Sequence, residues 1–306
     1  MMKPVYNLDD LISRDVLDAG ASKPARLAVI GWPVAHSASP QMHQAALDAN
    51  GIDARYIRLE VEPGRVSEAF SRMRELGFIG CNVTVPHKFD ALENCTEVDP
   101  AAHTLGAVNT VRFDEDATSG FNTDGPGFGR AIEDDFGVSL GSLQVAIAGA
   151  GGGAGQAIAT QCVLQGVPKL VLVNRTVEKL GFLVDRLRGL DSATEILSLS
   201  FDDRLLAQHC RACDLIVNTS SVGLKPGDSS ILPVECLKSE HFVYDTIYQP
   251  AVTPLLALAR SQGCHVSNGL SMLIHQGAFA FQHWFPQTDP AAVLAAMRKA
   301  LAKPAA

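Results

Sequence analysis

The segment Val145–Ala157 reads VAIAGAGGGAGQA, an apolar run that leads directly into a glycine-rich turn. Glycine permits a tight turn and lets the backbone approach a pyrophosphate at the N-terminus of the next helix. Gly149, Gly151 and Ala154 occupy the positions of a G-x-G-x-x-G/A motif. Alone, the motif also fits a purely structural turn, but here it follows a predicted strand and opens a predicted helix, which favours a dinucleotide site. The expected cofactor contacts in this loop are Gly149, Ala150, Gly151, Gly152, Gly153 and Ala154.

Further β-rich runs follow this segment, with helical stretches between most of them. Strands alternating with helices of about ten to fifteen residues predict crossover connections and a parallel sheet. The sequence therefore predicts an α/β fold with a Rossmann-type, doubly wound domain over residues 124–268. Its expected strands span residues 144–149, 169–174, 195–200, 214–220 and 242–248.

The end of the second strand of this domain bears on the choice of cofactor. NAD sites usually have Asp or Glu there to accept hydrogen bonds from the ribose, and a carboxylate would repel the 2′-phosphate of NADP. The chain has Asn174, Arg175 and Thr176 instead, with Lys179 one turn later. A guanidinium can pair with a phosphate and stack on adenine, although Arg175 could also be a solvated residue at a helix start. These residues favour NADP(H).

The first part of the chain has a similar alternating pattern. Its predicted strands span residues 26–31, 54–61 and 78–85, its helices 40–50 and 65–77, and its hairpin 106–113 with 117–123. Two helices over residues 271–285 and 290–302 end the chain. We therefore predict an α/β substrate domain whose sequence is discontinuous, with the cleft for the ligands between it and the cofactor domain. The predicted organisation is an arm over 1–25, a substrate domain over 26–123 and 269–306, and the cofactor domain over 124–268.

The bulk composition is that of an ordinary globular protein, with 47% hydrophobic and 19% charged residues among 306. A net charge of −8 argues against a nucleic-acid partner, because neutralising phosphates requires clustered Lys and Arg. No stretch approaches the roughly 20 apolar residues of a membrane span, and the N-terminus does not resemble a secretory signal. Seven scattered cysteines indicate reduced thiols, so we expect a cytoplasmic protein. The lone Cys210-x-x-Cys213 pair lacks the further ligands of a metal site, and none is predicted.

Two residues on either side of the hairpin could handle protons. Lys88 ends the string NVTVPHK, and Asp124 lies in FNTDG. A lysine and a carboxylate brought to one site can move a proton on and off an alcohol oxygen, which carbonyl reduction needs beside a hydride donor. Locally, Lys88 could equally be solvated, and Asp124 could cap a helix that starts at Gly125. The local pattern leaves these alternatives open.

A similar choice applies to the string WPVAHSASP, which follows the first predicted strand. Ser37 and Ser39 precede a helix and could hydrogen-bond a carboxylate or hydroxyl groups, helped by the positive helix end. Alternatively, Ser39 is only the N-cap of a helix whose first residue is Pro40. The local pattern by itself favours the cap.

Nine ordered strings resemble the shikimate dehydrogenase family, from about Leu27 to Trp284. In this family the N-terminal domain and the last helices bind the substrate, and the middle domain binds NADP. The resemblance implies reduction of 3-dehydroshikimate to shikimate in aromatic amino-acid biosynthesis. The strings are AHSASP, GCNVTVPHK, LGAVNT, NTDG, GAGGGAG, NRT, NTSSVG, YDTIYQPAVTPLL and NGLSMLIHQGA.

The resemblance also assigns roles to residues. It places Lys88 and Asp124 on the catalytic pair and Asn174–Thr176 on the 2′-phosphate site. It implies that Ser37 and Ser39 meet the substrate carboxylate, against the local preference for a cap. Gly269 and Met272 match positions near the nicotinamide. The family's substrate-binding positions are matched by Ser37, Ser39, Thr84, Asn109, Asp124, Gln276 and Tyr248, of which Tyr248 lies at the rim of the active site.

Two features depart from the family pattern. The glycine loop has an additional glycine, and Gln156 stands where members often carry Arg or Lys, so a phosphate contact from that basic side chain is in doubt. The arm before Arg26 has no counterpart in compact members. These departures concern the cofactor loop and the arm alone.

Three alternatives compete with this interpretation. A quinate/shikimate dehydrogenase using NAD is the nearest, and the Asn174–Thr176 string argues against it. A non-catalytic NADP-binding paralogue should have lost Lys88 or Asp124, and both are present. A methylenetetrahydrofolate dehydrogenase would not carry the strings AHSASP and NTDG. The expected partner is thus a small-molecule substrate, and the chain is expected to be a monomer or homodimer.

Overall fold

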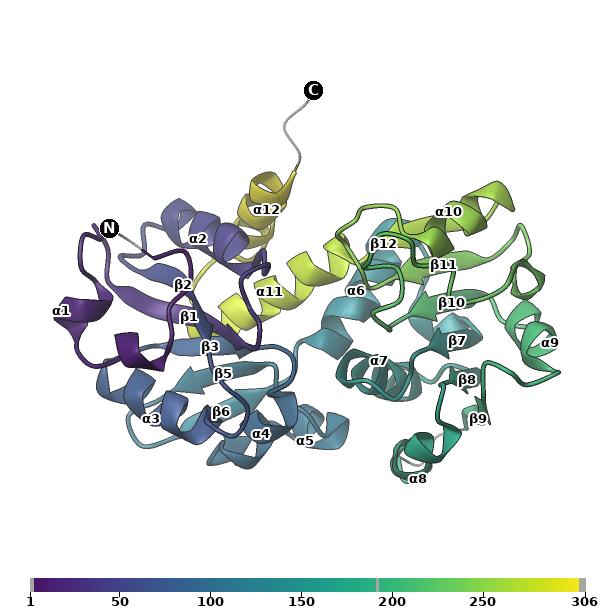
Figure 1. The fold of residues 1–306 in the computed structure, drawn as a ribbon, viewed down its shortest axis with the longest axis horizontal. Coiled ribbons are helices and arrows are strands. Elements are labelled where there is room, and N and C mark those ends of the chain that lie inside the picture. The colour runs from purple at the N-terminus through teal and green to yellow at the C-terminus, as the bar shows by residue number, and fades with distance from the viewer. Residues whose placement is uncertain (1–2, 191–192, 303–306) are drawn as a thin grey trace. The chain divides into compact units, whose positions relative to one another are not determined.

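The computed structural model describes residues 3–190 and 193–302 and divides the chain into two compact units. Unit 1 comprises residues 1–123 and 274–306, and unit 2 comprises residues 124–273. Each unit has its own six-stranded sheet, which confirms the predicted two-domain α/β class. Figure 1 labels the α-helices and most of the strands of both units.

Unit 1 contains a mixed sheet in the order β2-β1-β3-β5-β6-β4. β1, β2 and β3 are parallel to one another, β5 runs antiparallel to β3 and β6, and β4 is parallel to β6. β5 and β6 form the expected hairpin. The strands are β1 (Ala25–Gly31), β2 (Arg55–Glu60), β3 (Gly80–Val83), β4 (Glu97–Val98), β5 (Thr110–Phe113) and β6 (Thr118–Phe121).

Helices α2 and α12 pack against each other in unit 1, where Figure 1 shows them side by side. The helix α11 (Leu270–Trp284) begins in unit 2 and continues into unit 1. The sequence did not predict the short helices α4 and α5. The other helical elements of unit 1 are η1 (Leu8–Asp10), α1 (Arg14–Leu17), α2 (Ser39–Ala49), α3 (Val66–Glu75), α4 (Lys88–Glu93), α5 (Pro100–Leu105) and α12 (Pro290–Leu301).

The N-terminal arm is part of the core of unit 1. Tyr6 bridges to Leu59 of β2, and its backbone is hydrogen-bonded to Arg58 and Glu60. The core cluster around β1 and β2 includes the arm's buried side chains, so residues 3–25 belong with the substrate domain that the sequence began at 26. These side chains are Tyr6, Leu8, Leu11 and Leu17.

Unit 2 contains a fully parallel sheet in the order β12-β11-β10-β7-β8-β9. The strand order reverses between β7 and β10, and such a switch point is where open α/β sheets bind ligands. The last strand, β12, was not expected from the sequence. The strands are β7 (Val145–Ala148), β8 (Lys169–Val173), β9 (Glu195–Leu199), β10 (Leu215–Asn218), β11 (Phe242–Asp245) and β12 (His265–Asn268).

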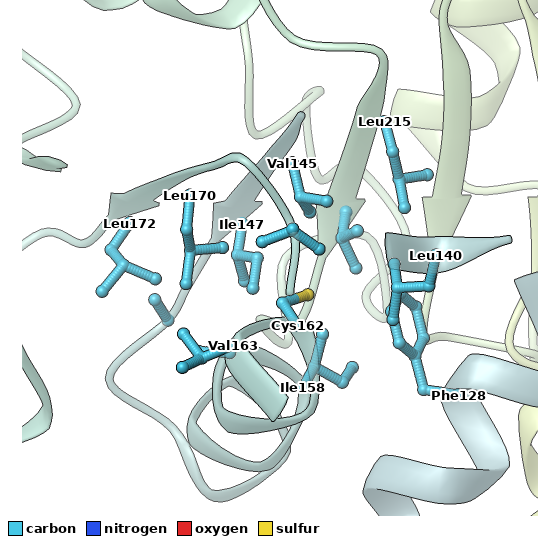
Figure 2. Close-up of a cluster of buried hydrophobic side chains, with 14 of the residues drawn as sticks. Phe128, Leu140, Val145, Ile147, Ile158, Cys162, Val163, Leu170, Leu172 and Leu215 are labelled. Atoms are coloured by element: carbon cyan, nitrogen blue, oxygen red, sulfur yellow. The ribbon is translucent and has the colours of Figure 1, made fainter. Parts of the chain in front are cut away.

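Apolar side chains from helix α7 cover one face of this sheet. Ile158 and Cys162 of α7 face Val145 and Ile147 of β7 in a fully buried cluster (Figure 2). The cores on the two faces give β7 its unbroken apolar run. The helical elements of unit 2 are α6 (Asp124–Phe136), η2 (Leu140–Ser142), α7 (Gly153–Leu164), η3 (Val177–Leu180), α8 (Gly181–Arg188), α9 (Leu206–Arg211), η4 (Val234–Cys236) and α10 (Pro254–Ser261).

Within the described residues, no helix is both long and apolar enough to cross a bilayer. The two predicted domain boundaries differ in how they compare with the structure. The first unit boundary falls between Thr123 and Asp124, where the sequence placed it, and the second lies after Leu273, beyond the expected position at residue 268. The displaced boundary lies inside α11, where a continuous helix carries no local signal of a division.

Candidate active site

The loop after β1 carries Ser37 and Ser39 at the carboxyl end of the strand. Helix α2 begins at Ser39, its N-cap is Ala38, and no side chain caps it. The Ser37 Oγ accepts a hydrogen bond from the Ser39 backbone nitrogen at 3.2 Å. The local alternative, in which Ser39 caps a helix starting at Pro40, is therefore wrong. Arg58 of β2 fixes the loop by donating to the Ser37 carbonyl oxygen from Nε at 3.1 Å and Nη2 at 2.7 Å.

Thr84 lies beside this loop because β3 pairs with β1. Gly31, at the end of β1, approaches Thr84 so closely that a Cβ there would lie 2.6 Å from the threonine Cγ2. The Trp32 backbone nitrogen donates to the Val85 carbonyl oxygen at 3.0 Å. Ser37, in the loop after β1, and Ser39, the first residue of α2, therefore lie at the same edge of the sheet as Thr84, in the loop after β3.

Asn109 is the centre of a buried hydrogen-bond network. Its Nδ2 donates to the Thr123 Oγ1 at 3.0 Å, and its Oδ1 accepts from the Thr123 backbone nitrogen at 2.8 Å. The Thr110 hydroxyl also donates to this Oδ1, at 3.0 Å. Asn82 Nδ2 donates to Thr110 Oγ1 at 3.2 Å, and Tyr56 donates its hydroxyl to Asn82 Oδ1 at 2.7 Å. All five residues are buried, so the network fixes the backbone at Thr123.

Each of the two candidate proton-handling residues adjoins a residue that is bonded in or next to this network. Lys88 is the first residue of α4, and its carbonyl oxygen accepts from the Val108 backbone nitrogen at 3.0 Å. Val108 precedes Asn109, which holds Thr123, and Thr123 precedes Asp124. Lys88 and Thr123, the last residue of unit 1 before Asp124, are thus both linked by these bonds to the segment Val108–Asn109. Asp124 is itself the first residue of α6 and is buried.

His87, next to Lys88, has a structural position. It is fully buried, and its Nε2 lies 2.7 Å from the carbonyl oxygen of Val61. Gln276, also buried, lies on the unit 1 part of α11 beside Gly277. A Cβ at Gly277 would collide with the Met42 side chain of α2, so this glycine lets the two helices approach closely. Gln276 is thereby held next to the helix that Ser39 begins.

Unit 2 presents the glycine loop at the carboxyl end of β7. The backbone nitrogens of Gly149 and Ala150 both donate to the Val173 carbonyl oxygen of β8. Gly149 has a φ of +85°, which side-chain-bearing residues rarely adopt. A Cβ at Gly151 would lie 3.0 Å from the Asn174 Nδ2. The glycines therefore let the loop turn tightly against β8 and Asn174 at the start of α7, where a helix N-terminus favours an anion such as a pyrophosphate.

The residue that lets α7 pack closely against the sheet is Gly155 rather than Ala154. A Cβ at Gly155 would lie 2.8 Å from each of three atoms: the Ala150 Cα, the Gly149 carbonyl oxygen and the Thr219 Oγ1. Ala154 is half-buried and accommodates its methyl group. The additional glycine of the loop has therefore moved the packing position one residue beyond the third position of the predicted motif.

The residues predicted to bind the 2′-phosphate follow β8. The Asn174 Nδ2 donates to the Thr176 carbonyl oxygen at 2.8 Å, which fixes this turn beside Gly151. Arg175 and Lys179 are exposed. No carboxylate occupies residues 174–176, so an anion can approach them without the repulsion that Asp or Glu would cause.

Gln156 extends this region onto the first turn of α7. Its Nε2 donates to the Gly151 carbonyl oxygen at 3.2 Å, and its Oε1 accepts from the Arg186 Nη2 at 3.1 Å. The Arg186 guanidinium of α8 is therefore hydrogen-bonded to Gln156, the position at which family members often carry Arg or Lys. Sequence reasoning missed Arg186 because the two residues lie 30 apart in the chain.

Tyr248, Gly269 and Met272 lie at the carboxyl ends of β11 and β12. The Gly269 nitrogen donates to the Ile247 carbonyl oxygen at 3.2 Å, and a Cβ at Gly269 would collide with the Thr246 backbone. The Met272 nitrogen donates to the Tyr244 hydroxyl at 3.2 Å. Burial raises the pKa of Tyr244, which keeps this hydroxyl protonated and able to hydrogen-bond the start of α11.

A buried carboxylate supports the loop opposite Gly149. Asp245 accepts hydrogen bonds from Asn218 Nδ2 at 3.1 Å and from the Thr253 hydroxyl at 2.6 Å. Burial raises its pKa, and these hydrogen bonds oppose the shift. Asn218 in turn accepts from the Ser220 nitrogen at 2.9 Å, and Ser220 packs against Gly149. No local pattern indicates this support, because its members come from three separate segments.

The predicted site residues thus form two groups. Unit 1 contains Lys88 and the predicted substrate-binding residues Ser37, Ser39, Thr84, Asn109 and Gln276. Unit 2 contains the predicted cofactor-binding residues, together with Asp124 and Tyr248. Within the described part of the chain, no cluster of three or more His, Cys, Asp or Glu side chains could hold a metal ion. Cys213 is buried, and burial raises its pKa to about 12, so it is an unreactive core thiol.

Comparison with known proteins gives matches over most of the chain. The model of the shikimate dehydrogenase substrate binding domain matches residues 29–111, and that of the shikimate 5′-dehydrogenase C-terminal domain matches residues 269–302. A shikimate dehydrogenase (NADP(+)) of Moorella thermoacetica is 39% identical over 269 residues, which are 88% of this chain and 90% of the relative.

Solved structures agree with these matches. A shikimate 5-dehydrogenase of Thermus thermophilus in complex with NADP(H) and shikimate is 35% identical, with a TM-score of 0.78 over 90% of this chain and 100% of the other. A quinate dehydrogenase of Corynebacterium glutamicum in complex with NAD is 30% identical, with a TM-score of 0.79 over 89% and 98%. The identity to the Moorella enzyme across about nine tenths of both chains shows that this chain belongs to the shikimate dehydrogenase family.

Proposed function

We propose that this protein catalyses the reversible, NADPH-dependent reduction of 3-dehydroshikimate to shikimate, a step of aromatic amino-acid biosynthesis. The observation that carries the proposal is the hydrogen bonding around Asn109: Lys88 is bonded through its carbonyl oxygen to Val108, which precedes Asn109, and Asn109 holds Thr123, the residue before Asp124. Two further observations support the proposal independently: the chain belongs to the family, and its glycine loop makes a tight turn at the start of α7.

The substrate end of this reaction uses the hydroxyls and amides at the carboxyl edge of the unit 1 sheet. Ser37 and Ser39 offer hydroxyl donors at the start of α2, where the helix dipole favours an anion such as the substrate carboxylate. Thr84, on the neighbouring loop, is expected to bind a ring hydroxyl. Asn109 and Gln276 complete the polar set, and Tyr248 is expected at its rim.

When bound, NADPH would supply the hydride, from its C4 to the carbonyl carbon of the substrate. Lys88 and Asp124 position the carbonyl oxygen and deliver the proton that it needs as the carbonyl becomes an alcohol. In the reverse direction the pair removes that proton. The Lys88 ammonium also stabilises negative charge developing on this oxygen, which lowers the barrier in both directions.

The unit 2 residues fit the cofactor that this reaction requires. Gly149 and Gly151 allow the tight turn before α7, the kind of turn whose backbone binds a pyrophosphate, and Gly155 lets α7 begin close to the sheet. Arg175 and Thr176 are expected to bind the adenosine 2′-phosphate, with Lys179 nearby. Gly269 and Met272 are expected beside the nicotinamide.

Replacing Lys88 tests the catalytic assignment. Lys88→Ala should lower kcat by about 10²–10⁴, the typical contribution of general acid–base catalysis. The measurement is absorbance of the reduced cofactor with shikimate and NADP. Lys299→Ala, which removes an exposed lysine from α12, is the matched control and should retain wild-type turnover. Near-wild-type turnover of Lys88→Ala would refute the assignment.

Oxidation of quinate with NAD is the nearest competing function, because a quinate dehydrogenase has the same fold. The exposed Arg175 and the absence of a carboxylate at residues 174–176 favour NADP instead. Values of kcat/KM for shikimate and quinate, each with NAD and NADP, separate the two functions. A preference for quinate with NAD would overturn the proposal. NADPH binding without turnover of either substrate would indicate a non-catalytic paralogue.

We further propose that the enzyme works in the cytoplasm as a monomer or homodimer on a small-molecule substrate. The support for this compartment is that all seven cysteines, each within the described residues, are free thiols. Sedimentation equilibrium of the purified chain distinguishes the two oligomeric states.

A further inference from the structure

Arg186 is a half-buried cation bound to the first turn of α7. Its Nη2 donates to the Gln156 Oε1 at 3.1 Å, and its buried Nε has no hydrogen-bond partner among the described residues. Burial lowers the pKa of this guanidinium, which nonetheless stays charged because an arginine pKa is far above neutral. Placing a charge here is therefore unfavourable unless something compensates for its lost hydration.

Protein carboxylates do not provide this compensation within residues 3–190 and 193–302. None of the ion pairs formed there includes Arg186, although arginines elsewhere in the chain pair with Asp or Glu. Among the described residues, its side-chain partner is the neutral amide of Gln156. A partly desolvated cation held by a neutral group is suited to an anion that arrives from outside the chain.

The contacts of Gln156 lead from Arg186 to the glycine loop. Gln156 Nε2 donates to the Gly151 carbonyl oxygen, and Gly151 packs directly against the Asn174 side chain. Arg186, Gln156, Gly151 and Asn174 therefore form a continuous row of contacts. The row ends at the turn to which the 2′-phosphate of NADP is assigned above.

We propose that Arg186 is a specificity-determining residue for NADP(H), which Gln156 holds beside the glycine loop so that its positive charge favours the adenosine 2′-phosphate. The inference rests on the proposed function, since it requires the phosphate to bind at residues 174–176. Arg186 thereby supplies from α8 a positive charge that α7 lacks at position 156.

The test compares NADPH with NADH, which lacks the 2′-phosphate. Arg186→Met keeps most of the side-chain stem and removes the charge. It should weaken NADPH binding about tenfold, equivalent to about 1.4 kcal/mol, and leave NADH binding within about twofold. Gln156→Glu should weaken NADPH binding likewise, because it would pair with Arg186 and neutralise it. Arg186→Lys should restore much of the preference. Dissociation constants come from fluorescence titration, and KM values for both cofactors provide a second readout.

Two further variants make the outcomes distinguishable. Arg188→Met removes an exposed arginine from the same helix and should change neither dissociation constant. Arg175→Ala tests the phosphate site itself, and a lack of effect on NADPH relative to NADH would refute that site together with the inference. If Arg175→Ala reduces the preference but Arg186→Met and Gln156→Glu do not, the inference alone fails. Equal losses for NADPH and NADH in Arg186→Met would show a purely structural role and also overturn it.

Discussion

Asn109 lies at the centre of the polar network of unit 1, where its side-chain amide hydrogen-bonds to Thr110 and Thr123. Its bonds to Thr110 and Thr123 continue through Asn82 to Tyr56, and every member is buried. Removing one partner from such a network leaves the other unsatisfied, at about 1–3 kcal/mol for each group. The network therefore holds Thr123, and with it the backbone of Asp124, in one position.

His43 adds a pH-sensitive element next to this network. Its ring stacks on Tyr56 with the ring centroids 4.5 Å apart, and it is fully buried. Burial, opposed by the Asn82 side chain, lowers the pKa of His43 from 6.5 to about 3. The depressed pKa means that the unfolded chain binds a proton before the folded chain does. The stability is thus fully present above pH 6.5 and is lost as the pH falls toward 3.

We expect the free energy of unfolding to fall by about 2 kcal/mol between pH 8 and pH 5 through His43 alone. His43→Phe, which retains an aromatic ring but cannot titrate, should lose this component of the pH dependence. Urea unfolding at both pH values measures it. The control is His265→Gln, at an exposed position, which should keep the wild-type pH dependence. An unchanged pH dependence in His43→Phe would contradict the expectation.

At the scale of the element, helix α7 depends on how closely it approaches the sheet. Its apolar residues pack on β7 and β8, as Figure 2 shows. Its N-terminus can lie against the glycine loop only because Gly155 has no side chain.

We expect Gly155→Ala to destabilise unit 2 by about 1–3 kcal/mol, because the new methyl group would press on the backbone at Gly149 and Ala150. The dissociation constant for NADPH should also rise. Gly181→Ala is the matched control, since nothing lies within 4 Å of its Cβ position at the start of α8. It should be neutral or stabilise by up to about 1 kcal/mol. Urea unfolding of both variants checks the difference, and equal stabilities would argue against the packing role.

For the whole molecule, the N-terminal arm contributes to the core of unit 1. Leu8, Leu11 and Leu17 are each at most 3% exposed and pack with residues of β1 and β2. Burying a leucine side chain contributes about 1.5–3 kcal/mol, so the arm stabilises unit 1 substantially. Its sequence suggested an appendage because its apolar residues are few and widely spaced.

Leu11→Ala should therefore cost about 2–5 kcal/mol of stability, as is typical of a buried leucine. Ile12→Ala is a neighbouring control, since Ile12 is 72% exposed. It should change the stability by less than about 0.5 kcal/mol. Denaturant midpoints of the two variants make the comparison. Similar small effects would show that the arm does not stabilise the core.

The elements that the sequence predicted well are those with strong apolar periodicity. The expected strands at 26–31, 169–174 and 195–200 match β1, β8 and β9 within about one residue at each end. The short elements α4, α5 and β12 were missed because four to six residues are too few to show a period. The second unit boundary was misplaced because α11 continues through it.

Sequence alone determined the α/β class and predicted the glycine loop, since burial periodicity and motif chemistry are local, whereas the resemblance to a family proposed the candidate site residues. The tertiary structure decided which side chains support them. Thr123 meets Asn109 only because β5 pairs with β6, and Arg186 meets Gln156 only because α8 packs beside α7. Such bonds join residues far apart in the chain, and their partners depend on strand pairing and helix packing that no local pattern encodes.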